Sequence, residues 1–108
     1  MAQNFRRYTK NGVGTSAETV LTADSYDTIV GISVCNVTTG TINVDVFIND
    51  GSNDIHLIKS APITQGSMLQ IIDGGSRFVV QNGDALKVKS DVAASADVWV
   101  SAVDSIST

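Results

Sequence analysis

Two residues of this chain have the chemistry of a catalytic nucleophile and a catalytic base. Cys35 is its one thiol and His56 its one imidazole. Catalysis by such groups needs a nucleophile, a base and an orienting residue within reach of one another. The two residues stand in separate apolar segments without a recognisable companion. We therefore expect Cys35 to be a small buried residue and His56 a surface or interface residue, and we predict no catalytic residues and a protein that is not an enzyme.

The segment 49–54, with the sequence N-D-G-S-N-D, has enough oxygen donors to attract a calcium ion. It lacks the regularly spaced carboxylates and the terminal glutamate of a calcium-binding loop. Asn, Asp and Gly also tolerate the positive φ angles of a hairpin, so a turn explains each residue of the segment. The sequence contains no phosphate-binding loop, dinucleotide fingerprint or cysteine–histidine set with metal-ligand spacing. We predict no metal and no cofactor.

Two aromatic residues alternate with valines in a way that directs them away from a core. Phe47 follows Val46, and Trp99 lies between Val98 and Val100. If the valines face the core, both aromatic side chains face outward, where large apolar groups mark contact surfaces. A sheet buried on both faces, or a β-bulge that shifts the register, would bury them instead. The sequence leaves both interpretations open.

The charge of the chain is distributed unevenly. Residues 1–17 contain three cations and no acid, whereas residues 18–108 contain four cations against all eleven acids, a net charge of −7. A basic leader on an acidic body is typical of an arm that docks on a neighbour, although the leader can also be an ordinary first strand. An acidic body is a poor partner for nucleic acid. Together with the two aromatic residues, the leader supplies the interface candidates: Phe5, Arg6, Arg7, Tyr8, Lys10, Phe47 and Trp99.

The elements that position these residues are strands. Apolar and polar residues alternate along the whole chain, no stretch holds a helical repeat, and strong helix formers are scarce. Turn residues separate short segments at the spacing of a β-sandwich. The segments expected to form strands are 19–22, 26–37, 42–48, 54–60, 68–72, 77–81, 86–89 and 97–103.

These seven to eight short strands predict an all-β fold, a single antiparallel β-sandwich over residues 18–108. A jelly-roll or an immunoglobulin-like topology fits the pattern, and a small barrel is the alternative. No apolar run reaches the ~20 residues of a membrane span, and no export signal precedes the domain. A single cysteine excludes an internal disulfide framework and suits folding in a reducing compartment.

Several segments resemble small virion proteins of tailed bacteriophages, especially phages of marine cyanobacteria. They are the basic segment at 6–12, an I-x-V-C-N strand at 32–36, I-N-D-G at 48–51, N-G-D-x-L-K-V at 82–88 and the last strand at 97–101. The resemblance implies a β-sandwich accessory protein that forms homo-oligomers, with a trimer as the first guess. It implies binding to other virion proteins, a location in the virion after assembly in the host cytoplasm, and no catalytic residues.

Three functions are therefore compared. The first is a non-enzymatic phage structural protein that decorates or cements the capsid or belongs to the neck or tail. The second is a carbohydrate- or receptor-binding module such as a tail adhesin, in which Trp99, Tyr26 or Tyr8 stacks on a ligand. The third is a cytoplasmic interaction domain of a bacterium. Aromatic residues form only 6% of the chain, which disfavours a sugar platform. None of the three involves a membrane or nucleic acid.

Overall fold

The computed structural model describes residues 4–23 and 27–104, including all of their side chains except those of 4–5, 72–78 and 104. The described residues form eight strands and no helix, and no membrane-crossing helix occurs among them. The strands are β1 (Asn4–Val13), β2 (Glu18–Thr22), β3 (Asp27–Asn36), β4 (Ile42–Asn49), β5 (Asp54–Ile63), β6 (Met68–Val80), β7 (Ala85–Ser90) and β8 (Ala96–Asp104).

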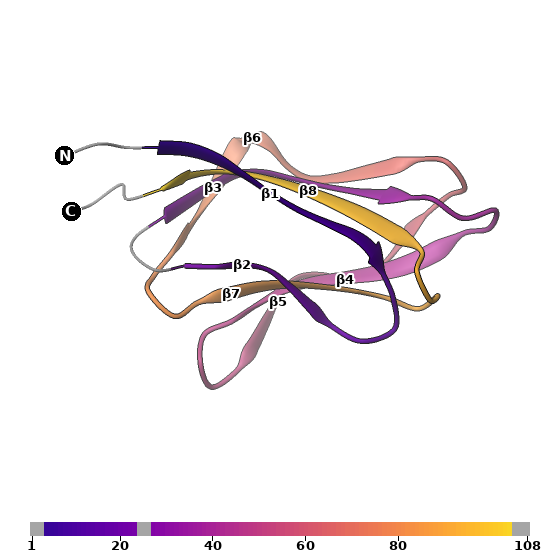
Figure 1. Ribbon diagram of the computed structural model, residues 1–108, viewed down its shortest axis with the longest axis horizontal. Helices are drawn as coiled ribbons and strands as arrows, with labels where there is room; N and C mark the ends of the chain where they lie inside the picture. Colours follow the sequence, from indigo (N-terminus) through magenta and orange to yellow (C-terminus); the bar gives the residue numbers. More distant parts are fainter. Residues whose placement is uncertain (1–3, 24–26, 105–108) are drawn as a thin grey trace.

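The strands form two antiparallel sheets that pack face to face (Figure 1). Sheet 1 has the order β1-β8-β3-β6, and sheet 2 has the order β2-β7-β4-β5. Consecutive strands mostly alternate between the sheets, which is the connectivity of a jelly roll. The predicted β-sandwich is confirmed, and of the topologies that the sequence allowed, the strand order selects the jelly roll over the immunoglobulin-like and barrel arrangements.

The core lies between the sheets and is built almost entirely from β-branched and leucine side chains. Ile32 and Val34 of β3 face Val44 and Val46 of β4, and all four side chains are 0% exposed. Such residues fit a pleated surface, and burying each one contributes roughly 1.5–3 kcal/mol. The residues between them along each strand are more exposed and form the two outer faces of the sandwich.

The basic leader is the first strand over its described part. β1 pairs with β8 from Asn4, opposite Asp104, to Lys10, opposite Val98, and it forms the edge of sheet 1. A bulge follows Lys10, where Gly12 takes a positive φ of 65°. Because β1 supplies one of the four strands of sheet 1, the described part of the leader follows the first-strand interpretation and belongs to the sandwich.

One predicted turn lies inside a strand. Residues 73–75 were expected to separate two strands, but β6 runs without interruption from Met68 to Val80. Phe78 of β6 is opposite Ile29 of β3, and Asp73 is opposite Gly31, so β6 contains the longer stretch of chain at this point. The prediction of a turn was wrong, because glycines in a strand interior also accommodate a bulge.

A buried asparagine holds the end of β3 to the opposite sheet. Asn36 is 1% exposed, and its Nδ2 donates to the carbonyl oxygens of Gly40 at 2.7 Å and Ile63 at 2.8 Å. Its Oδ1 accepts a hydrogen bond from the backbone N–H of Thr38 at 2.8 Å. Each polar atom of the amide thus has a partner, which removes the cost of burying it.

Candidate interaction surface

The outer face of sheet 1 carries the most exposed aromatic side chain among the described residues. Val98 and Val100 of β8 are buried in the core, so Trp99 between them points outward and is 52% exposed. Of the two interpretations that the sequence left open, Trp99 follows the exposed one. We call this surface the Trp99 face, and we define it by these residues: Arg7, Thr9, Ser33, Cys35, Met68, Asp97 and Trp99.

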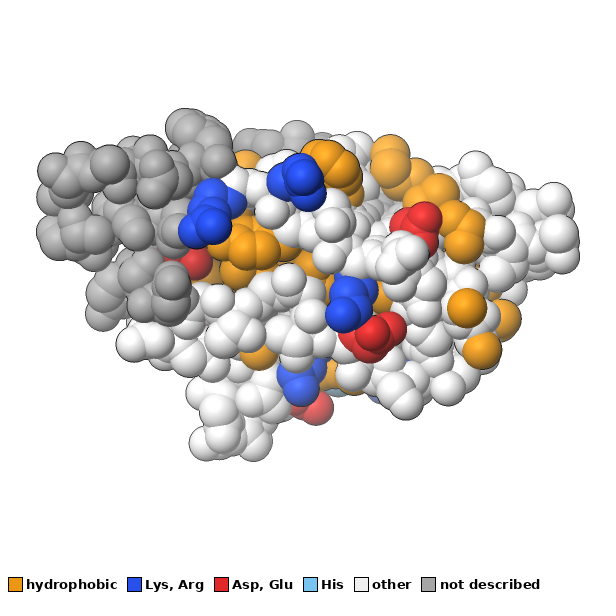
Figure 2. All heavy atoms as spheres, viewed as in Figure 1, with side chains coloured by type: hydrophobic (Ala, Val, Ile, Leu, Met, Phe, Trp, Pro, Cys, Tyr) orange, Lys and Arg blue, Asp and Glu red, His pale blue; other side chains and the backbone are white. Residues whose placement is uncertain are grey.

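An arginine from the edge strand lies against the indole. Thr9 of β1 is the cross-strand partner of Trp99, and Arg7 is the partner of Ser101. The Cζ atom of Arg7 lies 5.5 Å from the centroid of the Trp99 ring, within the range of a cation–π interaction. Figure 2, seen from the same side as Figure 1, shows basic side chains spaced along this edge of the sandwich. The basic leader and the exposed aromatic residue therefore belong to one surface.

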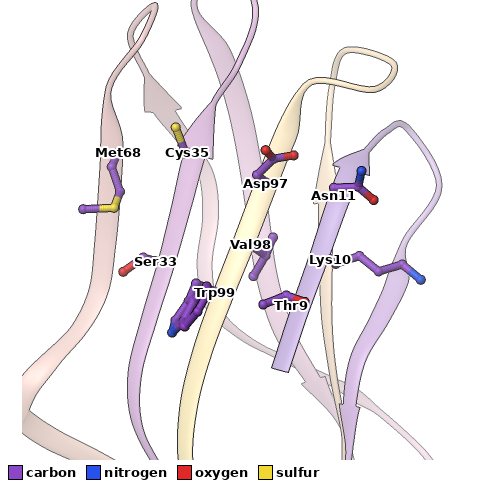
Figure 3. Close-up of a pocket in the computed structure, with 9 residues that line it drawn as sticks. All are labelled: Thr9, Lys10, Asn11, Ser33, Cys35, Met68, Asp97, Val98 and Trp99. Carbon is purple, nitrogen blue, oxygen red and sulfur yellow. The ribbon is translucent and has the colours of Figure 1, made fainter. Parts of the chain in front are cut away.

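A shallow groove of about 550 Å³ crosses the same face. Figure 3 shows Ser33 of β3 between Met68 of β6 and Trp99 of β8, with Cys35 further along the same strand. Met68 is 58% exposed, so large side chains border a floor of small ones. Large apolar side chains around a floor of small polar ones are suited to contact with another surface. No residue of the groove pairs a nucleophile with a base.

Cys35 was expected to be buried, and this prediction was wrong. Its side chain is half-buried on the outer face, where it is opposite Met68 on one side and Asp97 on the other. Ile32 and Val34 occupy the inward positions of β3, so the period of two turns Cys35 outward.

An acidic residue, Asp97, lines the groove on the side of Trp99 away from Ser101, the cross-strand partner of Arg7. The Oδ1 atom of Asp97 accepts a hydrogen bond from the backbone N–H of Gly12 at 3.0 Å, which fixes the carboxylate beside the bulge of β1. The side chain of Asp97 is exposed. A fixed carboxylate and a cation therefore come from positions on opposite sides of the indole along the strands.

The remaining candidates of the leader do not join this surface. Tyr8 is partly buried and packs against the core, whereas Arg6 is exposed. Lys10 lines part of the groove, but its side chain extends away from Trp99 (Figure 3), and its Nζ lies 3.6 Å from Glu18 of β2. The side chain of Phe5 and the whole of Tyr26 lie outside the described residues.

Phe47, an interface candidate, is buried, so of the two interpretations that the sequence left open it follows the second. The alternation does place it on the outer face of sheet 2, away from the core cluster, yet it is only 6% exposed. Its cross-strand partner on β5 is His56, whose ring centroid lies 4.9 Å from that of Phe47 with the planes tilted by 33°. Lys87 of β7 is its partner on the other side. His56 itself is exposed, as the sequence predicted.

The outer face of sheet 2, which we call the Phe47 face, is otherwise polar. Asp91 accepts hydrogen bonds from the backbone N–H of Asn43 at 2.9 Å and from its Nδ2 at 3.0 Å. These bonds, the backbone one first, hold the pKa of Asp91 below its usual value. Asp45 accepts a hydrogen bond from the backbone N–H of Ser60 at 2.6 Å and lies 4.0 Å from the Nζ of Lys59. Both aspartates of this face thus have partners within the chain.

The segment 49–54 uses its oxygen atoms in a hairpin between β4 and β5. Asp50 Oδ1 accepts hydrogen bonds from the backbone N–H groups of Asn53 at 2.8 Å and Ser52 at 3.0 Å. These bonds hold the pKa of the Asp50 carboxyl below its usual value. In the part of the chain that the structure describes, no three His, Cys, Asp or Glu side chains gather as a metal site would require.

Sequence reasoning found Arg7 and Trp99 but did not place them together, and it missed Met68, Ser33 and Asp97. The alternation directs Ser33 away from Ile32 and Asp97 away from Val98, which is the available signal for their outward position. Their proximity follows from the pairing of β1, β8, β3 and β6, which the sequence does not encode in any local pattern.

No protein-family model matches this sequence, and no curated protein matches it. The structure is similar to a solved chain from Bacillus endospore appendages, which are described as a novel family of disulfide-linked pili. The TM-score is 0.57 with 14% sequence identity, over 94% of this chain and 84% of the other. At this identity the likeness shows a shared fold alone, the all-β sandwich described above.

Proposed function

We propose that this chain is a non-enzymatic structural subunit that assembles with copies of itself and with other proteins into a larger particle. The observation that carries the proposal is the Trp99 face, where Trp99 and Met68 are 52% and 58% exposed on a rigid sheet. Exposed apolar side chains gathered on one face mark sites of protein contact. The similarity in fold to a pilus protein is in keeping with such a role.

The particle that we propose is the virion of a tailed bacteriophage, in which the chain decorates or cements the capsid or belongs to the neck or tail. Two observations support this proposal. Segments at 6–12, 32–36, 48–51 and 82–88 resemble small phage virion proteins. The strand order is that of a jelly roll, a topology that recurs in viral capsid proteins. In this proposal the protein folds in the host cytoplasm and resides in the virion.

The separation of the reactive side chains supports a non-enzymatic role. Cys35 lies on the outer face of sheet 1, and His56 lies on the outer face of sheet 2. The thickness of the sandwich therefore stands between the one thiol and the one imidazole of the chain, and neither can serve the other as nucleophile or base.

A carbohydrate-binding module is the second candidate, and the groove beside Trp99 favours it. The indole provides an aromatic surface, while Thr9, Asn11 and Ser33 line the groove with hydroxyl and amide groups. The jelly roll is also a fold of lectins. Arg7 already lies against the indole, however, which leaves less of its ring for a sugar.

Mass spectrometry and cryo-microscopy of purified particles of the phage that encodes this sequence test the proposal. We expect the chain in multiple copies per intact particle, in density that fits the jelly roll. Its presence in the infected lysate together with its absence from purified particles would contradict the virion assignment. A glycan array with the protein and with Trp99→Ala tests the second candidate, for which binding must be lost in the variant.

A further inference from the structure

We propose that the Trp99 face binds the Trp99 face of a second copy of this chain, about a twofold axis that passes through Trp99 and runs across the strands. The inference rests on the proposed function, because it names the partner of the same surface. It goes beyond that function by specifying the number of copies in the contact, the twofold axis that relates them and the residues that pair.

The two charged residues of this face come from positions on opposite sides of the indole along the strands. Asp97, Trp99 and Ser101 occupy successive outward positions of β8, each separated from the next by about 7 Å along the strand. Arg7 is the cross-strand partner of Ser101. A carboxylate therefore lies on one side of Trp99 along the strand. The backbone of Arg7 lies on the other side, on the neighbouring strand, and its Cζ is 5.5 Å from the centroid of the indole.

This arrangement selects one twofold axis over another. An axis that runs across the strands through Trp99 reverses the strand direction. It therefore places the partner subunit's Asp97 at the level of Arg7, and the partner subunit's Arg7 at the level of Asp97. An axis parallel to the strands keeps the direction and places the partner subunit's Asp97 against Asp97. Opposite charges at an interface fix its register, and like charges oppose binding. The first axis forms two identical Arg–Asp pairs around the indoles.

The groove provides room for the apolar centre of this contact. Ser33 is the cross-strand partner of Trp99, so a small side chain forms the floor of the groove at the level of the axis. Met68, which is 58% exposed, borders the groove on the far side. The partner subunit's Trp99 can enter there and stack in an offset arrangement beside the first indole, which is the geometry that aromatic pairs favour.

The area of the face is adequate for a reversible dimer. Four strands that lie about 4.8 Å apart and are about 30 Å long present roughly 600 Å² in projection. Standard interfaces bury about 800 Å² on each partner, and contacts near the lower limit are weak and depend on concentration. An isologous contact also closes on itself, which limits this assembly step to two copies. The trimer expected from the phage resemblance would need a different surface.

Sedimentation of the full-length protein over a range of concentrations tests the contact. We expect a reversible dimer that Trp99→Ala weakens at least tenfold, without a change in the far-UV circular dichroism spectrum. Arg7→Glu also weakens it at least tenfold, because the new carboxylate meets the partner subunit's Asp97. Asp97→Asn keeps the acceptor for the Gly12 N–H but removes the charge. Combined with Arg7→Glu, it should therefore recover several-fold of the lost affinity.

The matched control is Lys89→Glu, which changes the charge by the same amount on the exposed Phe47 face. We expect it to leave the dimer unchanged. If Lys89→Glu weakened the dimer as much as Arg7→Glu, net charge would explain the effect and the proposed contact would be wrong.

Cross-linking tests the axis directly. With the proposed axis, the Ser33 positions of two copies face each other across the ~10 Å that separates packed sheets. The two Cys35 residues are then about 17 Å apart, because each lies two residues from the axis. A short bis-maleimide should join Ser33→Cys/Cys35→Ser chains and leave the unaltered chain unjoined. Equal cross-linking of the two proteins would contradict the axis.

The outcomes separate this inference from the proposed function. A chain that is present in particles but sediments as a monomer, as a trimer, or as an oligomer insensitive to Trp99→Ala would overturn the dimer and leave the structural role standing. Loss of the dimer in Trp99→Ala and its recovery in the double variant would support the inference whichever particle contains the protein.

Discussion

The two outer faces of the sandwich are built from strands of the same kind, yet their aromatic residues have opposite environments. On the Trp99 face, the indole is 52% exposed beside a groove. On the Phe47 face, the phenyl ring is 6% exposed beneath His56. The inner faces cannot differ in this way, because both must pack with aliphatic side chains. In such a fold the two outer faces are therefore free to differ, and the cross-strand partners decide which aromatic residue is exposed.

The charges follow the same division. On the Phe47 face, Asp45 and Asp91 accept hydrogen bonds from backbone N–H groups, and Asp45 also lies near Lys59. On the Trp99 face, Asp97 accepts one such bond, and Arg7 lies against an aromatic ring instead of a carboxylate. On the Phe47 face, both aspartates thus have hydrogen-bond partners within the chain. The Trp99 face retains groups that another molecule can use.

The largest expected difference between the faces is in stability. Phe47→Ala removes a ring that is 94% buried, and we expect it to lower the free energy of unfolding by about 2–3 kcal/mol, somewhat less than in a core because an outer face can relax. Trp99→Ala removes a ring that is half exposed, and we expect less than about 1 kcal/mol. Urea unfolding measures both. Equal losses would mean that the two aromatic residues have the same structural role.

The connection between the sheets is expected to matter next. Asn36→Leu leaves the carbonyl oxygens of Gly40 and Ile63 without their buried donor, which should cost about 1–3 kcal/mol. Thermal unfolding of the variant measures the loss, with Thr38→Val as the control that removes a more exposed hydroxyl. A control that is less stable than Asn36→Leu would contradict the importance that we assign to the buried amide.

The Phe47 face should also contribute to the acid sensitivity of the protein through Asp91. Its pKa in the folded protein is lowered by the hydrogen bonds from Asn43, so the ionised form stabilises the fold above the unfolded pKa near 3.8. This contribution is lost as the pH falls through the lower folded pKa. We expect Asp91→Asn to be less stable than the unchanged protein at pH 7, and the difference to vanish in stronger acid. NMR titration of the Asp91 carboxyl carbon checks the direction; a midpoint above 3.8 would refute it.

The smallest expected effect is at the open edge where the two sheets meet. Lys10 and Glu18 lie 3.6 Å apart with side chains that are 39% and 35% exposed. Ion pairs of this exposure contribute a few tenths of a kcal/mol, about 0.2–0.5. A double-mutant cycle with Lys10→Ala and Glu18→Ala measures the coupling, which salt should reduce. A coupling that high salt leaves unchanged would show that packing, and not charge, joins the pair.

The sequence predicted the strands well because alternation is a local property. Ile32 and Val34, and likewise Val98 and Val100, mark the inward side of β3 and β8 without reference to any other strand. The wrong predictions arose where the usual environment of a residue type was given more weight than the alternation along the strand. Cysteines are often buried, yet the position of Cys35 between inward residues turns it outward.

The candidate surface could be predicted only in part. The direction of Trp99 follows from its neighbours in the chain, and so does the outer position of Phe47. The burial of Phe47 depends on His56, which is brought opposite it by a strand pairing that contains register shifts. The continuity of β6 also depends on its partner strand. The residue types at 73–75 predict a turn, whereas pairing with β3 keeps this part of the chain in one strand.

The local pattern of residues thus predicts that the protein is all-β and that its strands have one apolar and one polar side, and it allows Trp99 to face away from the core. The pairing of β1 with β8, which brings Arg7 to Trp99 and Gly12 to Asp97, is found only in the folded chain. The physical reason is the range of each effect. Alternation acts between adjacent residues of one strand, whereas pairing between β1 and β8 joins the two ends of the chain and is set by the closure of the whole sandwich.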